Sequence, residues 1–217
     1  MKKCIIIANG KAPSKSVIKY LQTIGYSALF CADGGADSAK KSGFVPDYII
    51  GDFDSANDQT IRYFKNKSKI IRIKRQNDTD VEKCLKFIIK KKYKEVMLLG
   101  ALGDRLDHSF CNLGIVHKFF DKIKIRIISG RSILTPYTGN VNLITLKGEI
   151  VSLYGINDKT KITSRGLKYP LKRTALPFGK KESTSNVAVE DSVRLNVEGG
   201  IIFVIREFNL LKKHGLI

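Results

Sequence analysis

The sequence predicts an α/β protein, in which a mostly parallel sheet with helices precedes a small all-β sandwich. Up to about residue 130, short apolar runs alternate with segments of helical spacing, a pattern typical of a parallel sheet covered on both sides. After residue 131 only short alternating runs remain, separated by glycine, asparagine and proline. We therefore expect two domains, at residues 1–130 and 131–217.

The first part carries six apolar runs that predict strands, at residues 4–8, 28–32, 48–50, 70–73, 96–99 and 125–128. Three segments between them place apolar side chains every three or four residues and predict helices, at residues 14–24, 81–92 and 108–120. The last helix is expected to have an apolar face made of Phe110, Leu113, Val116, Phe119 and Phe120. This alternation is Rossmann-like, although no P-loop and no Gly-x-Gly-x-x-Gly fingerprint occurs.

The second part predicts short strands at residues 142–146, 150–154, 161–163, 187–189, 192–197 and 201–205. The step Glu198-Gly199-Gly200 has the composition of a hairpin turn between the last two of them. We expect a sandwich or roll.

The composition indicates a globular protein with a real core, since 43% of its 217 residues are hydrophobic. No apolar run approaches the roughly 18 residues of a membrane span, and the apolar start is too short for a signal peptide. We therefore expect a cytoplasmic protein without a membrane partner. The four cysteines are widely spaced, so we expect small buried side chains rather than disulfides or a zinc site: Cys4, Cys31, Cys84 and Cys111.

The formal charge of +19 raises nucleic-acid binding as one alternative. Lysine outnumbers arginine almost threefold and is spread over many segments, which favours solvated lysine-rich faces instead. A general positive field also attracts an anionic nucleotide. We therefore expect no nucleic-acid partner.

Aspartates form an acidic island in this basic chain, because ten of the thirteen lie between Asp33 and Asp107. Most of them follow an apolar run that predicts a strand. In a parallel α/β sheet, ligands bind beyond the carboxyl ends of the strands, so one crevice would collect these side chains. Carboxylates gathered there are suited to holding Mg²⁺ against phosphate oxygens.

The first two acidic motifs each have a structural and a functional interpretation. After Asp33, Gly34 and Gly35 permit positive φ and a close approach of phosphate to the backbone, or they form a plain turn before a capped helix. Asp52 and Asp54 are two residues apart and would point the same way on an extended chain, where a cation relieves their repulsion.

The next two motifs also leave alternatives open. Thr79 and Glu82 have the spacing of a capping box, while Asp80 is a cap, a metal ligand or a base. Arg105 either clamps a phosphate with its bidentate fork or pairs with one of two neighbouring carboxylates, Asp104 and Asp107.

Taken together, these motifs resemble the thiamine pyrophosphokinase family. The resemblance rests on Ala-Asp-Gly-Gly-Ala (32–36), Gly-Asp-Phe-Asp-Ser (51–55), Asn-Asp-Thr-Asp-Val-Glu-Lys-Cys-Leu (77–85) and Gly-x-Leu-Gly-x-Arg-x-Asp-His (100–108). Residues 163–171 and 183–186 extend it into the second half. Six weak motifs in the family's order make a specific signal over nearly the whole chain.

The resemblance implies transfer of pyrophosphate from ATP to the hydroxyl of thiamine, which yields thiamine diphosphate and AMP with Mg²⁺ as cofactor. It implies an ATP- and Mg²⁺-binding α/β domain and a thiamine-binding β domain. It also implies a homodimer, in which thiamine lies between the α/β domain of one chain and the β domain of the other.

The resemblance and the residue chemistry described above together assign roles to residues. The metal ligands would be Asp33, Asp52, Asp54 and Asp80, and the catalytic residues Asp54, Asp80 and Arg105. ATP or substrate would contact Gly34, Gly35, Ser55, Thr79, Asp107, Ser183, Ser185 and Asn186. Either Asp80 or Asp54 would accept the proton of the attacking hydroxyl.

One departure from the family pattern concerns stacking on thiamine. Animal members have an aromatic residue a few positions after the Ser-Asn step, whereas this chain has Val187-Ala188-Val189. Stacking then falls to Tyr169 or Phe178, or is weaker. The competing enzyme hypothesis is a Mg²⁺-dependent phosphotransferase or phosphohydrolase that acts on another substrate.

Overall fold

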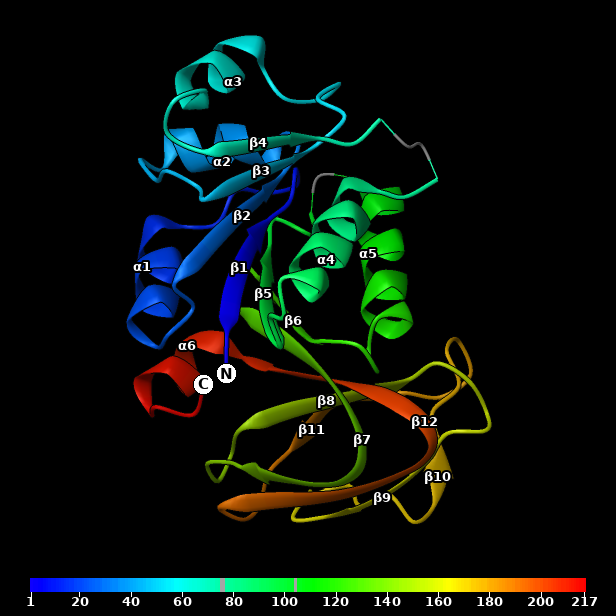
Figure 1. The fold of residues 1–217 in the computed structure, drawn as a ribbon. Coiled ribbons are helices and arrows are strands. Elements are labelled where there is room, and N and C mark those ends of the chain that lie inside the picture. The colour runs from blue at the N-terminus through cyan, green and yellow to red at the C-terminus, as the bar shows by residue number, and fades with distance from the viewer. Residues whose placement is uncertain (75–76, 104) are drawn as a thin grey trace. The chain divides into compact units, whose positions relative to one another are not determined.

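The computed structural model describes residues 1–74, 77–103 and 105–217. The chain forms two compact units, Met1–Gly130 and Arg131–Ile217 (Figure 1).

Unit 1 is built on a six-stranded parallel sheet in the order β6-β5-β1-β2-β3-β4. Its strands are β1 (Lys3–Ile7), β2 (Ala28–Ala32), β3 (Tyr48–Gly51), β4 (Lys69–Arg72), β5 (Glu95–Leu99) and β6 (Lys124–Ser129). The central strands are apolar on both faces because helices cover both, and every residue of β5 is buried. The six predicted strands are confirmed, with small differences at their ends.

Five helices connect these strands: α1 (Lys15–Thr23), α2 (Gly35–Lys41), α3 (Asp58–Phe64), α4 (Asp80–Lys90) and α5 (Leu106–Lys118). Figure 1 shows α4 and α5 on one face of the sheet and α1 on the other. Side chains cap three of them, since Ser14, Asn57 and Thr79 each accept a backbone N–H of the first turn. The seven-residue α3 has too few turns to show helical periodicity in the sequence.

The predicted apolar face of α5 is wrong at Phe110, whose side chain is 58% exposed. Val116 and Phe119 of the predicted face are buried, and Asn112 and Ile115 complete the buried side of the helix. The Asn112 amide donates to the carbonyl oxygen of Ala101 at 2.7 Å, so a polar residue satisfied by the backbone occupies an inward position.

The four cysteines are free, and Cys4, Cys31 and Cys84 are buried as expected. Cys111 is exposed, so the expectation of burial is wrong there. Cys111 precedes Asn112 on α5, and because Asn112 lies on the buried side of this helix, Cys111 lies on the exposed side.

Unit 2 is antiparallel and consists of β7 (Ser132–Ile144), β8 (Ile150–Gly155), β9 (Lys161–Arg165), β10 (Thr174–Ala175), β11 (Ser183–Val187) and β12 (Ser192–Glu207), followed by α6 (Phe208–Lys213). β12 pairs with β7 along its whole length, and its first part also pairs with β9 and its last part with β8. This long pair therefore joins two layers of strands. Figure 1 shows β12 curving between them.

The predicted hairpin at Glu198-Gly199-Gly200 is wrong, because β12 runs through these residues as one strand. The register shifts between Val197 and Ile202, and Gly199 has φ +75°. Gly139 on the facing strand β7 also has positive φ, so both strands bend together rather than one reversing direction. Two further predictions are shifted, since β7 begins ten residues before residue 142 and β11 ends at Val187.

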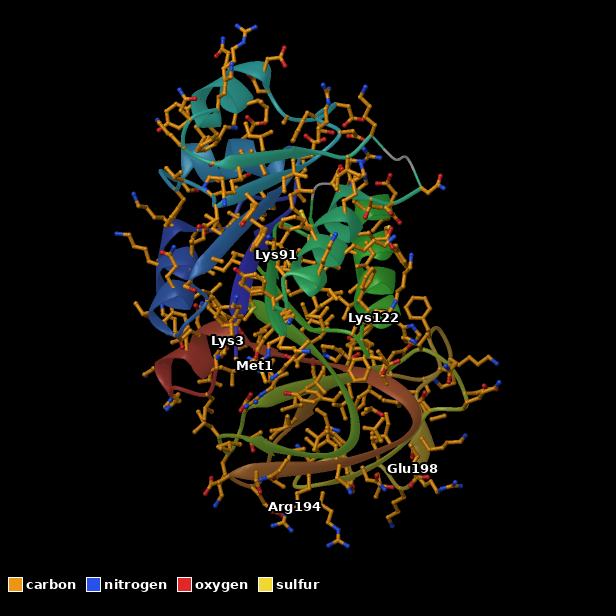
Figure 2. The ribbon with its side chains drawn as sticks, viewed as in Figure 1. Met1, Lys3, Lys91, Lys122, Arg194 and Glu198 are labelled. Carbon is orange, nitrogen blue, oxygen red and sulfur yellow. The ribbon has the colours of Figure 1, made fainter. Side chains whose placement is uncertain are left out.

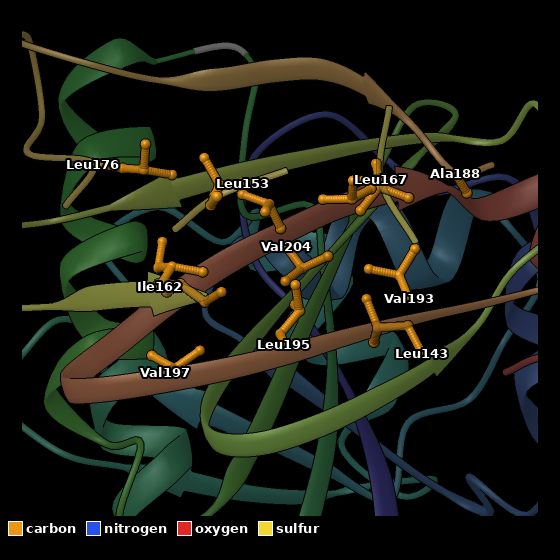
Figure 3. Packing of buried hydrophobic residues seen from close by; sticks show 13 residues of the cluster. Leu143, Leu153, Ile162, Leu167, Leu176, Ala188, Val193, Leu195, Val197 and Val204 are labelled. Carbon is orange, nitrogen blue, oxygen red and sulfur yellow. The ribbon is translucent and has the colours of Figure 1, made fainter. Parts of the chain in front are cut away.

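The core of unit 2 lies between its layers. Side chains from facing strands meet there, including Leu143, Leu153, Ile162, Leu195 and Val204 (Figure 3). Among the described residues, no helix is both long enough and apolar enough to cross a membrane.

Candidate active site

A pocket of about 720 Å³ opens at the carboxyl edge of the unit 1 sheet. Four of the five segments that line it follow a strand directly, after β1, β2, β3 and β5, and the fifth enters α4. This is where a parallel sheet leaves a crevice for ligands. Its polar lining includes Asn9, Asp33, Asp52, Asp54, Ser55, Asp78, Thr79, Asp80, Lys83, Arg105 and Asp107.

Three carboxylates meet in this pocket. One oxygen atom each of Asp33, Asp52 and Asp80 lies within 4.8 Å of the other two. Asp33 follows β2, Asp52 follows β3, and Asp80 begins α4, so the parallel order β2-β3 and the packing of α4 bring them together. Like charges at such distances repel unless a proton or cation lies among them.

Asp33 is the most enclosed of the three, with 1% of its surface exposed. Its carboxylate accepts the backbone N–H of Ala56 at 2.9 Å and that of Ser55 at 3.4 Å. Burial, together with the nearby Asp80, raises the pKa of Asp33 to about 6 despite these hydrogen bonds. Its position depends on Gly51, because a Cβ there would lie 2.9 Å from the Cβ of Asp33.

Gly34 and Gly35 follow Asp33 and lead into α2. A Cβ on Gly35 would lie 2.1 Å from the carbonyl oxygen of Ile7, so only glycine lets the helix start this close to β1. The sequence leaves two interpretations of these glycines open, a plain turn before the helix and a close approach of phosphate to the backbone. Both agree with the structure, because the turn is tight and lies beside the pocket.

Lys83 is a functional candidate that sequence reasoning missed. Its ammonium donates to Asp52 at 2.9 Å and to Asp80 at 2.8 Å, and its side chain is 3% exposed. Burial alone would lower the pKa of Lys83, but the two carboxylates raise it above the ordinary value. The same contact lowers the pKa of Asp52. The spacing of three residues after Asp80 on a helix was the available signal for one of the two pairs.

The pKa of Asp80 is also raised above its ordinary value. Burial raises its pKa, and the Lys83 ammonium partly opposes that rise. Thr79 forms the predicted capping box with Glu82, so the helix cap is confirmed for Thr79. The side chain of Asp80 is thus left to the carboxylate cluster.

The expected extended geometry at Asp52 and Asp54 is wrong, because Phe53 between them has φ +65°. Asp54 lines the pocket but is exposed and lies outside the group of three close carboxylates. It accepts the hydroxyl of Ser55 at 3.0 Å. The carboxylate that completes the cluster with Asp52 and Asp80 is therefore Asp33.

Arg105 pairs with Asp107 through both arms of its fork, at 3.2 Å from Nε and 2.5 Å from Nη2. The guanidinium lowers the pKa of Asp107 to about 2. Both side chains are exposed at the pocket wall. Of the two pairing alternatives, the structure shows Asp107, and Asp104 lies outside the described residues.

In unit 2, Ser183, Ser185 and Asn186 lie on β11. The buried Asn186 amide accepts the N–H groups of Tyr169 and Val187 and donates to the Tyr169 carbonyl and the Ser183 hydroxyl. All four hydrogen-bonding positions of this amide are therefore used within the protein. Asn186 fixes the backbone of Tyr169, whose ring is largely exposed.

The fold and the pocket define a class, that of α/β transferases which handle phosphate groups at the carboxyl edge of a parallel sheet. Residues 23–128 match the family described as thiamin pyrophosphokinase, catalytic domain. Residues 134–202 match the family described as thiamin pyrophosphokinase, vitamin B1 binding domain. The chain belongs to the thiamin pyrophosphokinase family, so the family and fold class expected from the sequence are confirmed.

Individual relatives agree with this membership. Thiamin pyrophosphokinase 1 of Caenorhabditis elegans is 31% identical over 188 residues, which cover 80% of this chain and 76% of that protein. The crystal structure of thiamine pyrophosphokinase from Bacillus subtilis shares the fold, with a TM-score of 0.78 and 24% identity over 95% of this chain and 99% of that one. Thiamin pyrophosphokinase from Candida albicans gives a TM-score of 0.83 and 19% identity over 95% and 89%.

Asp33→Asn tests the electrostatic conflict in the metal-free protein. A carboxyl whose pKa rises from 3.8 to about 6 on folding binds its proton more tightly in the folded state. Its contribution to stability is therefore lost as the pH rises between these values. Because asparagine does not titrate, the unfolding free energy of Asp33→Asn relative to wild type should increase over this range by up to about 3 kcal/mol.

Urea unfolding at several pH values across that range measures this difference. Asp37→Asn is the matched control, since it removes a carboxylate of the same turn that accepts from Asn57 outside the cluster. A difference between Asp33→Asn and wild type that stays constant with pH would contradict the electrostatic account.

Proposed function

We propose that this chain transfers the pyrophosphoryl group of ATP to the hydroxyl oxygen of thiamine, giving thiamine diphosphate and AMP. The observation that carries the proposal is the gathering of Asp33, Asp52 and Asp80 in one pocket at the carboxyl edge of the sheet. Transfer of phosphate groups requires mainly positioning and neutralisation of charge. The pocket is suited to both, and membership of the thiamin pyrophosphokinase family supports the same reaction.

In this proposal Asp33, Asp52 and Asp80 hold Mg²⁺. The donor set fits, because carboxylate oxygens are the ligands Mg²⁺ prefers and these three converge with an excess of negative charge. The raised pKa of Asp33 points the same way, since a bound cation would relieve the cause of that rise. When bound, Mg²⁺ supplies neutralisation of charge on the phosphate oxygens.

Asp54 is our choice for the base that accepts the hydroxyl proton of thiamine. Asp80 is occupied by Lys83 and belongs to the close group of carboxylates, whereas Asp54 is exposed at the pocket. A general base must reach the proton it takes, and an exposed carboxylate beside the metal ligands meets that requirement. The hydroxyl of Ser55 orients the Asp54 carboxylate.

Arg105 is proposed to contact the phosphates, with Asp107 holding its guanidinium in place. Gly34 and Gly35 would let phosphate oxygens approach the backbone beside Asp33. The hydroxyl of Thr79 is used by the helix cap, so we assign Thr79 the task of positioning Asp80.

The thiamine-binding side is proposed to lie in unit 2, with Tyr169 as the ring that stacks on thiamine. Asn186 holds the Tyr169 backbone through both its N–H and its carbonyl, and Ser183 in turn accepts from Asn186. A pre-positioned aromatic ring stacks at low entropic cost. Ser185 would lie in the same segment. We also propose a homodimer, as the family resemblance implies, in which the α/β unit of one chain and the β unit of its partner enclose thiamine. We propose a cytoplasmic location, as the sequence pattern predicts.

An assay with Mg·ATP and thiamine tests the function. AMP and thiamine diphosphate should form in equal amounts and only when thiamine is present. Hydrolysis of ATP at the same rate with and without thiamine would favour the phosphohydrolase alternative. Formation of ADP instead of AMP would contradict pyrophosphoryl transfer. The formal charge of +19 leaves nucleic-acid binding as a weaker alternative. Lys91 and Lys122, labelled in Figure 2, are exposed and belong to separate segments of the chain.

Asp52→Asn and Asp54→Asn separate metal binding from proton transfer. Asp52→Asn should weaken Mn²⁺ binding at least tenfold, because a close carboxylate is lost. Asp54→Asn should leave Mn²⁺ affinity within about threefold of wild type while lowering kcat at least a hundredfold. Titration of Mn²⁺ and steady-state kinetics measure both quantities, and equal losses of metal affinity in the two variants would remove Asp54 from the role of base.

Tyr169→Ala tests the stacking surface. Loss of the ring should raise KM for thiamine about tenfold and leave KM for ATP unchanged, since stacking on a base is worth roughly 1–3 kcal/mol. Phe178→Ala is the matched control, because Phe178 is also an exposed aromatic residue of unit 2 but is not held by Asn186. A larger effect of Phe178→Ala than of Tyr169→Ala would reverse the assignment.

A further inference from the structure

We propose that the Lys83 ammonium is a permanent cation of the cluster formed by Asp33, Asp52 and Asp80. Because this ammonium neutralises one of the three carboxylate charges, a single divalent metal ion balances the rest. This inference rests on the proposed function, which supplies the metal. It makes Lys83 a positioning residue for the metal ligands.

The contacts of Lys83 set it apart from the other lysines of this region. Its ammonium lies 2.9 Å from Asp52 and 2.8 Å from Asp80, so it joins a residue after β3 to the first residue of α4. By contrast, Lys86 has one carboxylate partner in the described part of the chain, Asp78, and its side chain is 48% exposed. Lys86 lies on the same helix and shows what an ordinary surface pair looks like here.

Burial gives the contact its significance. Taking an ammonium out of water costs several kcal/mol, and only close, well-oriented carboxylates offset that cost. Lys83 is one of the buried residues of α4, together with Val81 and Leu85, and its side chain is 3% exposed. The ammonium therefore stays within the cluster whether or not a metal is bound.

The charges then account for one metal ion. Within the close group, three carboxylates and one ammonium leave a formal charge of −2, which matches one divalent cation. The Asp54 carboxylate lines the same pocket but lies outside this group. Asp52 and Asp80 each give one oxygen atom to Lys83, whereas Asp33 binds backbone N–H groups and has no cationic partner among the described residues. Lys83 neutralises one of the two charges of Asp52 and Asp80, so the charge left over is the remaining one of that pair together with the charge of Asp33. A metal ion is needed beside these oxygen atoms.

Lys83→Met tests this role through metal binding in the absence of nucleotide. Removal of the ammonium changes the cluster charge from −2 to −3, so the variant should bind Mn²⁺ at least tenfold more tightly than wild type. Lys86→Met, the matched control, removes a lysine that contacts a different carboxylate and should change the affinity less than threefold. Electron paramagnetic resonance of free Mn²⁺ measures affinity and stoichiometry in all three proteins.

Wild-type protein should bind one Mn²⁺ at this cluster. Two ions in wild type, or unchanged affinity in Lys83→Met, would overturn the inference. A merely structural lysine would lower the melting temperature without tightening metal binding. We expect instead that Mg²⁺ raises the melting temperature of Lys83→Met more than that of wild type.

Lys83→Gln provides a second variant should Lys83→Met fail to fold without metal. It keeps hydrogen-bond donors and removes the charge, so its Mn²⁺ affinity should also rise at least tenfold, and an unchanged affinity would again overturn the inference. Thiamine-dependent formation of AMP by wild type is measured in parallel. If AMP forms and the affinity does not rise, the role of Lys83 fails and the proposed function stands.

Discussion

Mutual repulsion among Asp33, Asp52 and Asp80 is the constraint on which the site depends. Their oxygen atoms lie within 4.8 Å of one another, in a place where burial raises the pKa of Asp33 to about 6. Carboxylates this close repel one another unless a proton or a cation lies among them. One part of the compensating charge is the Lys83 ammonium, and we assign the rest to a divalent cation.

The sheet topology produces this arrangement. Neighbouring parallel strands β2 and β3 deliver Asp33 and Asp52 to the same edge, and the capping box at Thr79 fixes where α4 starts and hence where Asp80 lies. Glycine at position 51 allows the β3 backbone to pass against Asp33. Backbone packing thus holds the three carboxylates together. Their mutual repulsion lowers the free energy of unfolding of unit 1.

Much of this was accessible from the sequence. Alternating apolar runs predicted every strand of unit 1, and the position of Asp33 and Asp52 directly after neighbouring strands predicted that they meet. The Thr79–Glu82 spacing predicted the cap. These features depend on neighbouring residues or on the parallel order of the strands. The pattern of residues along the sequence is therefore enough to predict them.

The features that sequence reasoning missed depend on contacts between distant residues. Lys83 reaches Asp52, 31 residues away, and no periodicity marks such a pair. A positive φ at Phe53 separates Asp54 from Asp52, although the residue type does not favour it. In unit 2 the step at Gly199 has the composition of a turn, but pairing with β7 on both sides carries the strand through it as a bend. In this last case tertiary pairing overrides the local signal.

The most direct measurement of the central claim is a crystal grown with Mn²⁺, thiamine and a non-hydrolysable ATP analogue, examined by anomalous scattering. We expect one manganese peak, with oxygen atoms of Asp33, Asp52 and Asp80 about 2 Å from the ion and the Lys83 ammonium still between Asp52 and Asp80. A manganese ion bound away from these three carboxylates would contradict it.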